Sequence, residues 1–280
     1  MLNYFRPKTI NECLDYICDD RVYIAGGTDL LVEMKNGHDL SKNTVIDLTH
    51  IPELSGVKRE NDEIEIMACT THDNVVLNKD INQCLRALSS ACRSVGSPQI
   101  RNMGTIGGSV GTASPASDPM PALMLADGRV VLINKKGETR EEGLEDFIVK
   151  PGVTTLKNDE MILSIKVKSL KEYKQSFFKI GRRKALAIAR LNFAMAILKN
   201  DDETIKDIKI VIGAALPVTK RFYDIEKMLV GKKLTEDLIE QVSKEISEQV
   251  LAIAGPRKSS EYKIPVIKNV VNSMLKEMEV

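Results

Sequence analysis

Two glycine-rich segments carry the residue types best suited to hold a phosphorylated ligand. The first, Ala25-Gly26-Gly27-Thr28-Asp29, follows a short apolar stretch and precedes an amphipathic one. Glycines let the backbone take positive φ and approach a ligand closely, and N–H groups at the start of a following helix attract anions. Thr28 can donate its hydroxyl there, and Asp29 can cap the helix or accept from a sugar hydroxyl. Taken alone, such a segment is more often a plain glycine turn, and it matches neither G-x-G-x-x-G nor a P-loop.

The second segment, Arg101 to Pro115, contains four glycines with serines and threonines among them. It is too polar for a core strand and too rich in glycine for a helix, so we expect a loop. Backbone amides and hydroxyls without lysines suit a diphosphate held by neutral donors. Two such segments in one domain favour an extended nucleotide gripped from both sides over two coincidental turns.

Charged residues outside these segments allow several interpretations. Asp118 precedes Pro119 and is a candidate helix N-cap, and its carboxylate could also accept from a ribose or ribityl hydroxyl. The basic run Lys179 to Lys184 is a solvated turn, a cation beside a bound cofactor or phosphate, or a docking surface for an acidic partner. No H-E-x-x-H, kinase motif or Cys/His nucleophile pair is present, so we assign no catalytic residue. Any chemistry would then belong to a bound cofactor.

Composition excludes several classes of protein. The 280 residues are 43% hydrophobic, and 40 basic against 39 acidic side chains give a net charge of +1. A wholly disordered chain and a whole-chain nucleic-acid binder are therefore not expected. No apolar stretch approaches the roughly 20 residues that span a bilayer, and the N-terminus shows no secretion leader. The five cysteines are scattered, which predicts reduced cytoplasmic thiols and no metal or iron–sulfur site built from this chain.

The elements that must position these residues follow from periodicity. An α/β unit is expected first, with helix Thr9–Asp19, strand Arg21–Ala25, helix Leu30–Lys35 and strand Val45–Leu48. A hairpin over 57–67 and a mostly helical stretch over 71–95 come next. Further strands are expected at 130–134, 161–167 and 175–180. An antiparallel pair at 191–198 and 204–214 precedes three amphipathic helices at 219–229, 235–251 and 259–278, the last with Pro265 in its first turns.

Five motifs together resemble the FAD-binding medium subunits of the molybdenum hydroxylases. That family includes bacterial xanthine, nicotinate and carbon monoxide dehydrogenases. The resemblance covers essentially the whole chain, and the order of both glycine segments makes it specific. The motifs are Phe5-Arg6-Pro7, Ala25 to Leu31, Gly96 to Asn102, Thr105 to Ser109 and Phe178 to Arg183.

The resemblance implies an α+β fold in two parts. Residues 1–172 would form an FAD-binding domain of the vanillyl-alcohol-oxidase (PCMH) type, with subdomains at about 1–55 and 56–172. Residues 173–280 would form a C-terminal flavoprotein domain with a three-stranded antiparallel sheet and a helix bundle. The strands and helices expected after residue 190 agree with that C-terminal domain.

The resemblance also implies which residues contact FAD. Asp118 would bond a sugar or ribityl hydroxyl, Leu163 would pack near the flavin, and Lys179 would approach its ring. Val95 occupies the position where eukaryotic relatives place an aromatic residue near the adenine, so stacking is not expected there. The diphosphate and adenosine would be lined by Tyr23, Ile24, Ala25, Gly26, Gly27, Thr28, Asp29 and Leu30. The diphosphate or ribityl chain would be held by Thr105, Ile106, Gly107, Gly108, Ser109 and Thr112.

By the same resemblance, the chain would be the electron-transfer subunit of a heteromeric enzyme of the xanthine dehydrogenase type. A small subunit with two [2Fe-2S] clusters would deliver electrons that a large molybdopterin subunit takes from the substrate. FAD would pass them to NAD or another acceptor. The alternative is a nucleotide-binding scaffold subunit without redox activity. A stand-alone FAD oxidase ranks last, because no substrate base is evident.

Overall fold

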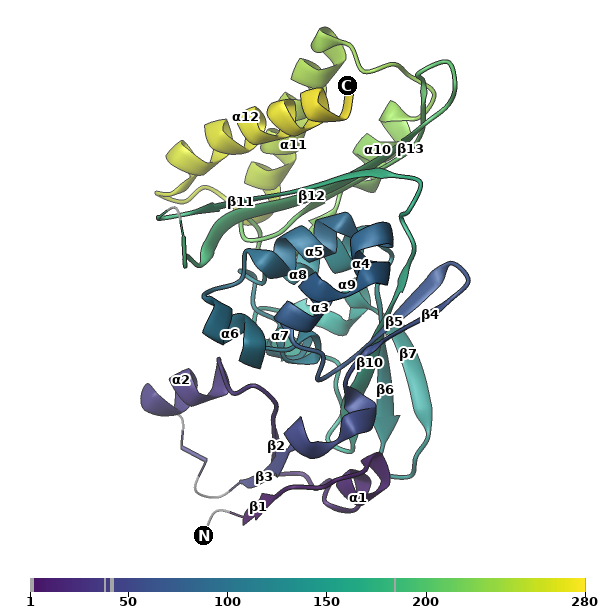
Figure 1. The fold of residues 1–280 in the computed structure, drawn as a ribbon. Coiled ribbons are helices and arrows are strands. Elements are labelled where there is room, and N and C mark those ends of the chain that lie inside the picture. The colour runs from purple at the N-terminus through teal and green to yellow at the C-terminus, as the bar shows by residue number, and fades with distance from the viewer. Residues whose placement is uncertain (1–2, 38, 41–42, 184, 280) are drawn as a thin grey trace.

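The computed structural model stacks three layers along the chain from one end to the other (Figure 1). It describes residues 3–37, 39–40, 43–183 and 185–279, so Lys184 of the basic run lies outside the described residues. A small parallel sheet lies at the N-terminal end, a five-stranded sheet with helices on one face lies in the middle, and a helix-covered sheet forms the other end. No helix in the described part of the chain has the length and apolar character needed to cross a bilayer.

The N-terminal layer is the expected α/β unit. Strand β3 lies between β1 and β2 and is parallel to both. Thr9 caps the first helix by accepting from the Glu12 N–H, as predicted. That helix ends at Asp15 rather than Asp19, where aspartates and a cysteine of low helix propensity follow. The elements are β1 (Asn3–Phe5), α1 (Ile10–Asp15), β2 (Arg21–Ile24), α2 (Leu30–Lys35) and β3 (Thr44–Asp47).

The middle layer is an antiparallel sheet in the order β4-β5-β10-β6-β7, with its core between the sheet and helices. Ile64, Ile66 and Ile165 line that core and are fully buried. The strands are β4 (Val57–Glu60), β5 (Glu63–Met67), β6 (Arg129–Asn134), β7 (Thr139–Gly143) and β10 (Glu160–Lys168). A separate two-stranded sheet contains β8 (Ile148–Lys150) and β9 (Val153–Thr154). The helices are α3 (His72–Leu77), α4 (Lys79–Cys84), α5 (Arg86–Arg93), α6 (Pro98–Met103), α7 (Ile106–Thr112), α8 (Pro119–Leu125) and α9 (Leu144–Phe147), and the short 3₁₀ turns are Leu48–His50 and Pro52–Leu54.

The second glycine segment is helical, which corrects the prediction of a loop. It contains the end of α6 and the whole of α7. Thr105 caps α7 by accepting from the Gly108 N–H at 3.0 Å. Ile106 and Val110 are fully buried on the inner side of α7. Burial of these two apolar side chains and the cap therefore offset the low helix propensity of the glycines.

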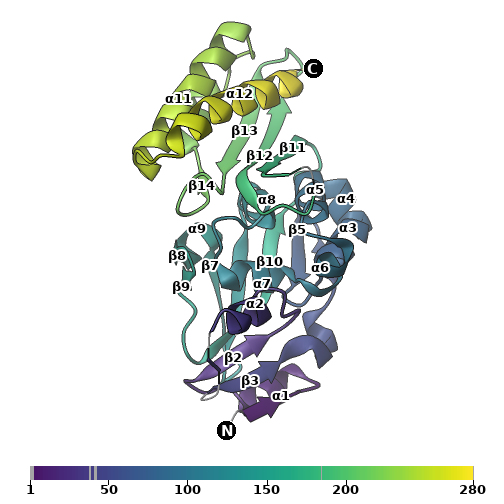
Figure 2. The ribbon, with the colours of Figure 1, turned by 90° about the vertical axis from the view of Figure 1, so that its left-hand side faces the viewer.

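The C-terminal layer is a sheet covered by helices on its outer face (Figure 2). Both faces of β12 are buried: Ala194 and Ala196 pack on the middle layer, whereas Phe193 and Met195 pack beneath the helices. The sheet is β11 (Lys174–Gly181), β12 (Ala189–Lys199), β13 (Ile205–Ile212) and a two-residue fourth strand, β14 (Lys220–Arg221), that the prediction did not include. The helices are α10 (Tyr223–Leu229), α11 (Glu236–Ala254) and α12 (Ser260–Glu279).

An ion-pair cluster joins the middle layer to the C-terminal layer. Asp127 contacts Lys209 at 2.9 Å, Arg221 at 2.5 Å and Lys168 at 3.3 Å, and Arg221 also contacts Glu226 at 2.8 Å. Burial alone would raise the pKa of Asp127, but Lys209 and Arg221 hold it below its usual value. The cluster thus fixes how the C-terminal sheet sits on the middle layer.

Candidate functional site

The two glycine segments lie in direct contact. An ideal Cβ built on Gly26 would overlap the Met103 carbonyl and would lie 2.9 Å from the Gly104 nitrogen. Gly27 has φ +66°, in the left-handed region. Only a residue without a Cβ lets the β2–α2 turn approach the α6–α7 turn this closely. The structure therefore brings together two segments that lie far apart in sequence.

The first segment presents backbone donors. The N–H groups of Ala25, Gly26, Gly27 and Thr28 donate to no acceptor among the described residues. Asp29 precedes α2, but its side chain makes no capping hydrogen bond, so the expected capping role is not observed. Buried or half-buried amides without partners are uncommon in folded proteins. Four in succession make a cradle that an anion such as a diphosphate would satisfy.

Helix α7 presents a face without side chains. Gly108 and Gly111 are exposed. A Cβ on Gly111 would meet only Ile162 Cδ1 at 3.3 Å, and one on Gly108 only Thr105 Oγ1 at 2.9 Å. Each such glycine costs the helix about 0.5–1 kcal/mol relative to alanine. Packing within the chain does not require glycine at 111, so the bare face fits a flat or extended ligand lying along the helix.

The other residues predicted on α7 divide by role. Ile106 and Gly107 are buried, and their N–H groups donate to the carbonyls of Thr70 and Ala68. They therefore contribute shape rather than the hydrogen bonds that the sequence suggested. Ser109 and Thr112 are half-buried, and each adds a hydroxyl to the helix that carries the bare face.

Tyr23 and Leu163 belong to strands β2 and β10. Both are half-buried against the small core between the N-terminal and middle layers. The Tyr23 hydroxyl donates to the Glu160 carbonyl at 3.2 Å. The backbone carbonyl of Leu163 accepts from the Ala68 N–H at 3.0 Å. Ile24 and Leu30 flank the first segment and are half-buried as well.

A buried ion pair lies where the middle and C-terminal layers meet. The Lys179 ammonium, 12% exposed, pairs with the Asp118 carboxylate, 6% exposed, and also donates to the Ser94 carbonyl at 2.9 Å. Asp118 begins α8 but its side chain makes no cap bond, so the predicted capping role is not observed. Burial raises the pKa of Asp118, and Lys179 offsets only part of that rise.

Two polar atoms beside this pair have no partner. Asn192 Nδ2 donates to the Ser117 carbonyl at 3.0 Å and to Asp118 at 3.5 Å. Its Oδ1 atom and the Ser117 Oγ atom are buried and make no hydrogen bond within the described part of the chain. Leaving a buried polar atom unsatisfied costs about 1–3 kcal/mol. Asn192 Oδ1 lies against Gly213, where an ideal Cβ would be only 2.2 Å from it, so a ligand edge that reaches this cluster would meet Ser117 Oγ rather than Asn192.

Sequence reasoning missed several residues of this site. Gly111 was counted among the glycines but given no role, and Ser94, Ser117 and Asn192 were not singled out. Asn192 sits inside an apolar strand, and that isolated polar residue is the one local signal for it. The other positions depend on contacts between segments that the sequence does not reveal.

The rest of the basic run points outward. Arg182 and Arg183 are exposed at the turn between β11 and β12, and Arg183 donates to the Leu186 carbonyl. Lys179 alone of these three cations turns into the protein. The run is thus a solvated turn attached to one inward-facing lysine.

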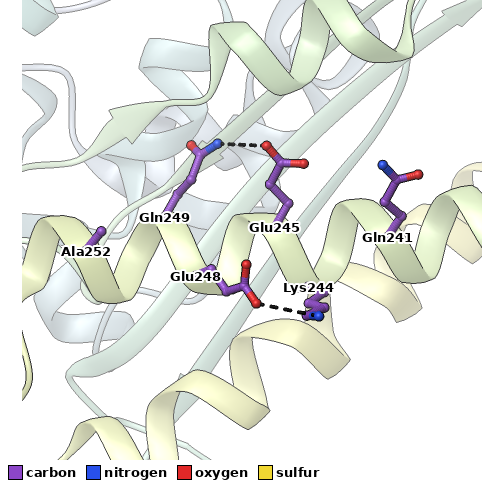
Figure 3. A pocket seen from close by; sticks show the side chains of 6 residues that line it. All are labelled: Gln241, Lys244, Glu245, Glu248, Gln249 and Ala252. Atoms are coloured by element: carbon purple, nitrogen blue, oxygen red, sulfur yellow. Dashed lines mark hydrogen bonds and ion pairs between the residues drawn. The ribbon is translucent and has the colours of Figure 1, made fainter.

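An open hollow along α11 is unrelated to the glycine segments (Figure 3). Its side chains are polar and pair along the same helix, with Lys244 3.8 Å from Glu248 and Gln249 3.4 Å from Glu245. No buried polar group faces it among the described residues. We therefore assign it no ligand.

Comparison with known proteins identifies both parts of the chain. Residues 1–167 match the family model of the FAD binding domain in molybdopterin dehydrogenase, and residues 176–278 match that of the CO dehydrogenase flavoprotein C-terminal domain. The glyceraldehyde dehydrogenase medium chain of Sulfolobus acidocaldarius is 31% identical over 99% of this chain and 98% of its own length. The nicotinate dehydrogenase FAD-subunit of Eubacterium barkeri is 32% identical over 97% and 94%.

Solved structures show the same fold. A carbon monoxide dehydrogenase from Hydrogenophaga pseudoflava that lacks the molybdenum-pyranopterin moiety superposes with a TM-score of 0.89 at 24% identity. The match covers 99% of this chain and 96% of that chain. Quinoline 2-oxidoreductase from Pseudomonas putida 86 also gives a TM-score of 0.89, at 19% identity, over 100% and 97%.

The fold and the matched models together define a flavoprotein subunit of an oxidoreductase, with FAD as its cofactor. Within that class, the chain belongs to the family of FAD-binding medium subunits of the molybdenum hydroxylases. The resemblance read from the sequence is confirmed. The amides of residues 25–28, unpaired within the described part of the chain, and the bare face of α7 fit that cofactor.

Proposed function

We propose that this chain carries electrons inside a heteromeric molybdenum hydroxylase of the xanthine dehydrogenase type. A small subunit with [2Fe-2S] clusters supplies the electrons, a large molybdopterin subunit oxidises the substrate, and NAD or another acceptor receives the electrons from FAD. The four amides at residues 25–28, which donate to no acceptor among the described residues and lie beside a second glycine segment, are the observation that carries the proposal.

The proposal assigns the diphosphate and adenosine to the first segment and its neighbours. There the backbone amides supply neutral donors, so the anion is held without a lysine. These residues are Tyr23, Ile24, Ala25, Gly26, Gly27, Thr28, Asp29 and Leu30. Helix α7 supplies the second side through Thr105, Ile106, Gly107, Gly108, Ser109 and Thr112.

The ring end is assigned to Asp118, Leu163 and Lys179. FAD, when bound, accepts and releases electrons singly or in pairs, which lets one-electron clusters serve a two-electron acceptor. The Lys179 side chain would lie beside the ring, and its ion pair with Asp118 holds it in place. Ser117 Oγ would contact the ligand edge, and Asn192 Nδ2 holds the Ser117 carbonyl and Asp118 in place. No residue of this chain is assigned a catalytic proton transfer.

We also propose domain limits and a location. The FAD-binding domain of vanillyl-alcohol-oxidase type spans residues 1–172, with subdomains at about 1–55 and 56–172, and the C-terminal domain spans 173–280. The short link between β10 and β11 supports the boundary. The five cysteines are all free thiols, which supports a reducing, cytoplasmic location.

The test uses the native complex purified from its source. Denaturation is expected to release one FAD per copy of this chain, measured by absorbance and chromatography. NADH-driven dye reduction then separates the electron-transfer subunit from a nucleotide-binding scaffold, because a scaffold reduces no dye above background. A complex that releases no flavin refutes the proposal, and one with flavin but no dye reduction favours the scaffold alternative.

A further inference from the structure

His72 lies beneath the junction of the two glycine segments and has no role in the site described above. It is the first residue of α3 and is 3% exposed, and its backbone N–H donates to the Gly104 carbonyl at 3.0 Å. A Cβ built on Gly104 would lie 3.2 Å from His72 Cδ2 and 3.3 Å from Thr28 Oγ1. The imidazole is therefore packed directly behind the contact between the segments.

The two ring nitrogens of His72 have different surroundings. Nε2 lies 3.2 Å from Ser109 Oγ, on the helix that carries the bare glycine face. Nδ1 is buried and has no hydrogen-bond partner among the residues that the structure describes. Burial, together with the charge of Arg101, lowers the pKa of His72 to about 4. The ring is therefore neutral at physiological pH and carries one proton, on one of the two nitrogens.

The surroundings favour a proton on Nε2. A buried N–H without an acceptor is rarer in proteins than an acceptor that lacks a donor. Placing the proton on Nδ1 would create such an orphan donor, whereas placing it on Nε2 gives it Ser109 Oγ as acceptor.

We propose that His72 is a positioning residue that donates from Nε2 to Ser109 Oγ, so that the single hydroxyl proton of Ser109 is left to donate to a phosphoryl oxygen of FAD. This inference rests on the proposed function, in which Ser109 contacts the diphosphate. With the opposite tautomer, Ser109 would spend its proton on the imidazole and could only accept. A serine in that state would face an anion with lone pairs alone.

Two polar substitutions separate the role of Nε2 from that of packing. A glutamine at 72 can place an amide donor near the Nε2 position, whereas the shorter asparagine places its amide near the Nδ1 position. We therefore expect His72→Gln to bind FAD within about threefold of wild type. His72→Asn is expected to bind about tenfold more weakly, as Ser109→Ala is, for the loss of one hydrogen bond to a charged group. The double variant His72→Asn/Ser109→Ala is expected to be no weaker than Ser109→Ala alone.

The assay is titration of the flavin-stripped full chain with FAD, followed by flavin fluorescence, with ³¹P spectra of the bound diphosphate. Additive losses in the double variant, or equal losses in His72→Gln and His72→Asn, overturn the positioning role. A full chain labelled with ¹⁵N-histidine gives a readout that does not depend on flavin, because ring nitrogen shifts separate protonated from bare nitrogens. A bare Nε2 in that spectrum overturns the inference. Failure of the wild-type chain to bind FAD overturns the proposed function instead.

Discussion

Replacing Gly111 by alanine is expected to move stability and flavin affinity in opposite directions. Gly111 is an exposed residue of α7 with ordinary backbone geometry, and the added methyl group would meet only the flexible end of Ile162 at 3.3 Å. The helix gains about 0.5–1 kcal/mol from the exchange. For a chain of this size the flavin-free protein is expected to melt about 1–3 °C higher.

Flavin binding is expected to weaken in the same variant. If the bare face of α7 contacts the cofactor, the new methyl group intrudes on a packed interface, and such overpacking costs about 1–3 kcal/mol. That range corresponds to a dissociation constant raised about 5- to 150-fold. An alanine at an exposed site with no ligand would leave the affinity unchanged.

The assay pairs thermal melting of the flavin-free chain with titration by FAD. Gly137→Ala is the matched control, because Gly137 has φ +82° in an open turn with no atom within 4 Å. The control is expected to lose about 1–2 kcal/mol of stability through the left-handed backbone and to keep full affinity. Unchanged FAD affinity in Gly111→Ala would refute the assignment of α7 as a cofactor surface.

Three further predictions concern the loops, the buried ion pair and the domain junction. Gly27→Val places a branched residue at φ +66° and is expected to lower the FAD content well below one FAD per purified chain, measured as released flavin. Full stoichiometry would contradict the cradle of backbone amides. Lys179→Met leaves the buried Asp118 carboxylate unpaired, so it is expected to lower the free energy of unfolding in urea by about 3–5 kcal/mol, and adding Asp118→Asn is expected to recover most of that loss. Equal stability of the single and double variants would argue against a coupled pair. Folding lowers the pKa of Asp127, so its contribution to stability is present above its unfolded pKa and is lost as the pH falls through its folded pKa. Asp127→Asn is therefore expected to flatten the decline of the unfolding free energy from pH 5 to pH 3, and an unchanged slope would count against the ion-pair cluster at the domain junction.

Local patterns predicted most of the elements, because burial on one face leaves a readable period. The alternation in Glu63-Ile64-Glu65-Ile66 predicted β5, and the apolar run at 191–198 predicted β12, whose two faces are both buried. The three helices after residue 219 were predicted within a few residues at most ends. Amphipathic helices of this length give a strong signal.

The misses come from effects that act between distant segments. Glycine content predicted a loop at 106–112, but two buried side chains and the Thr105 cap make it helical. Strand β14 has two residues, too few to show an alternation of polar and apolar side chains. It forms because its backbone pairs with the edge of β13. Ser117 and Asn192 lie 74 to 75 positions from their partners, and their pairing depends on how the domains dock.

The cluster around Lys179 belongs to neither domain alone. Asp118 and Ser117 come from the first part of the chain, whereas Lys179 and Asn192 come from the C-terminal sheet. A molecule that contacts residues of both parts binds to both, so its binding free energy also opposes their separation. On the assignment proposed above, uptake of the coenzyme and closure of the two parts on each other would be one equilibrium, and a chain whose last hundred residues have not yet docked would hold its coenzyme weakly.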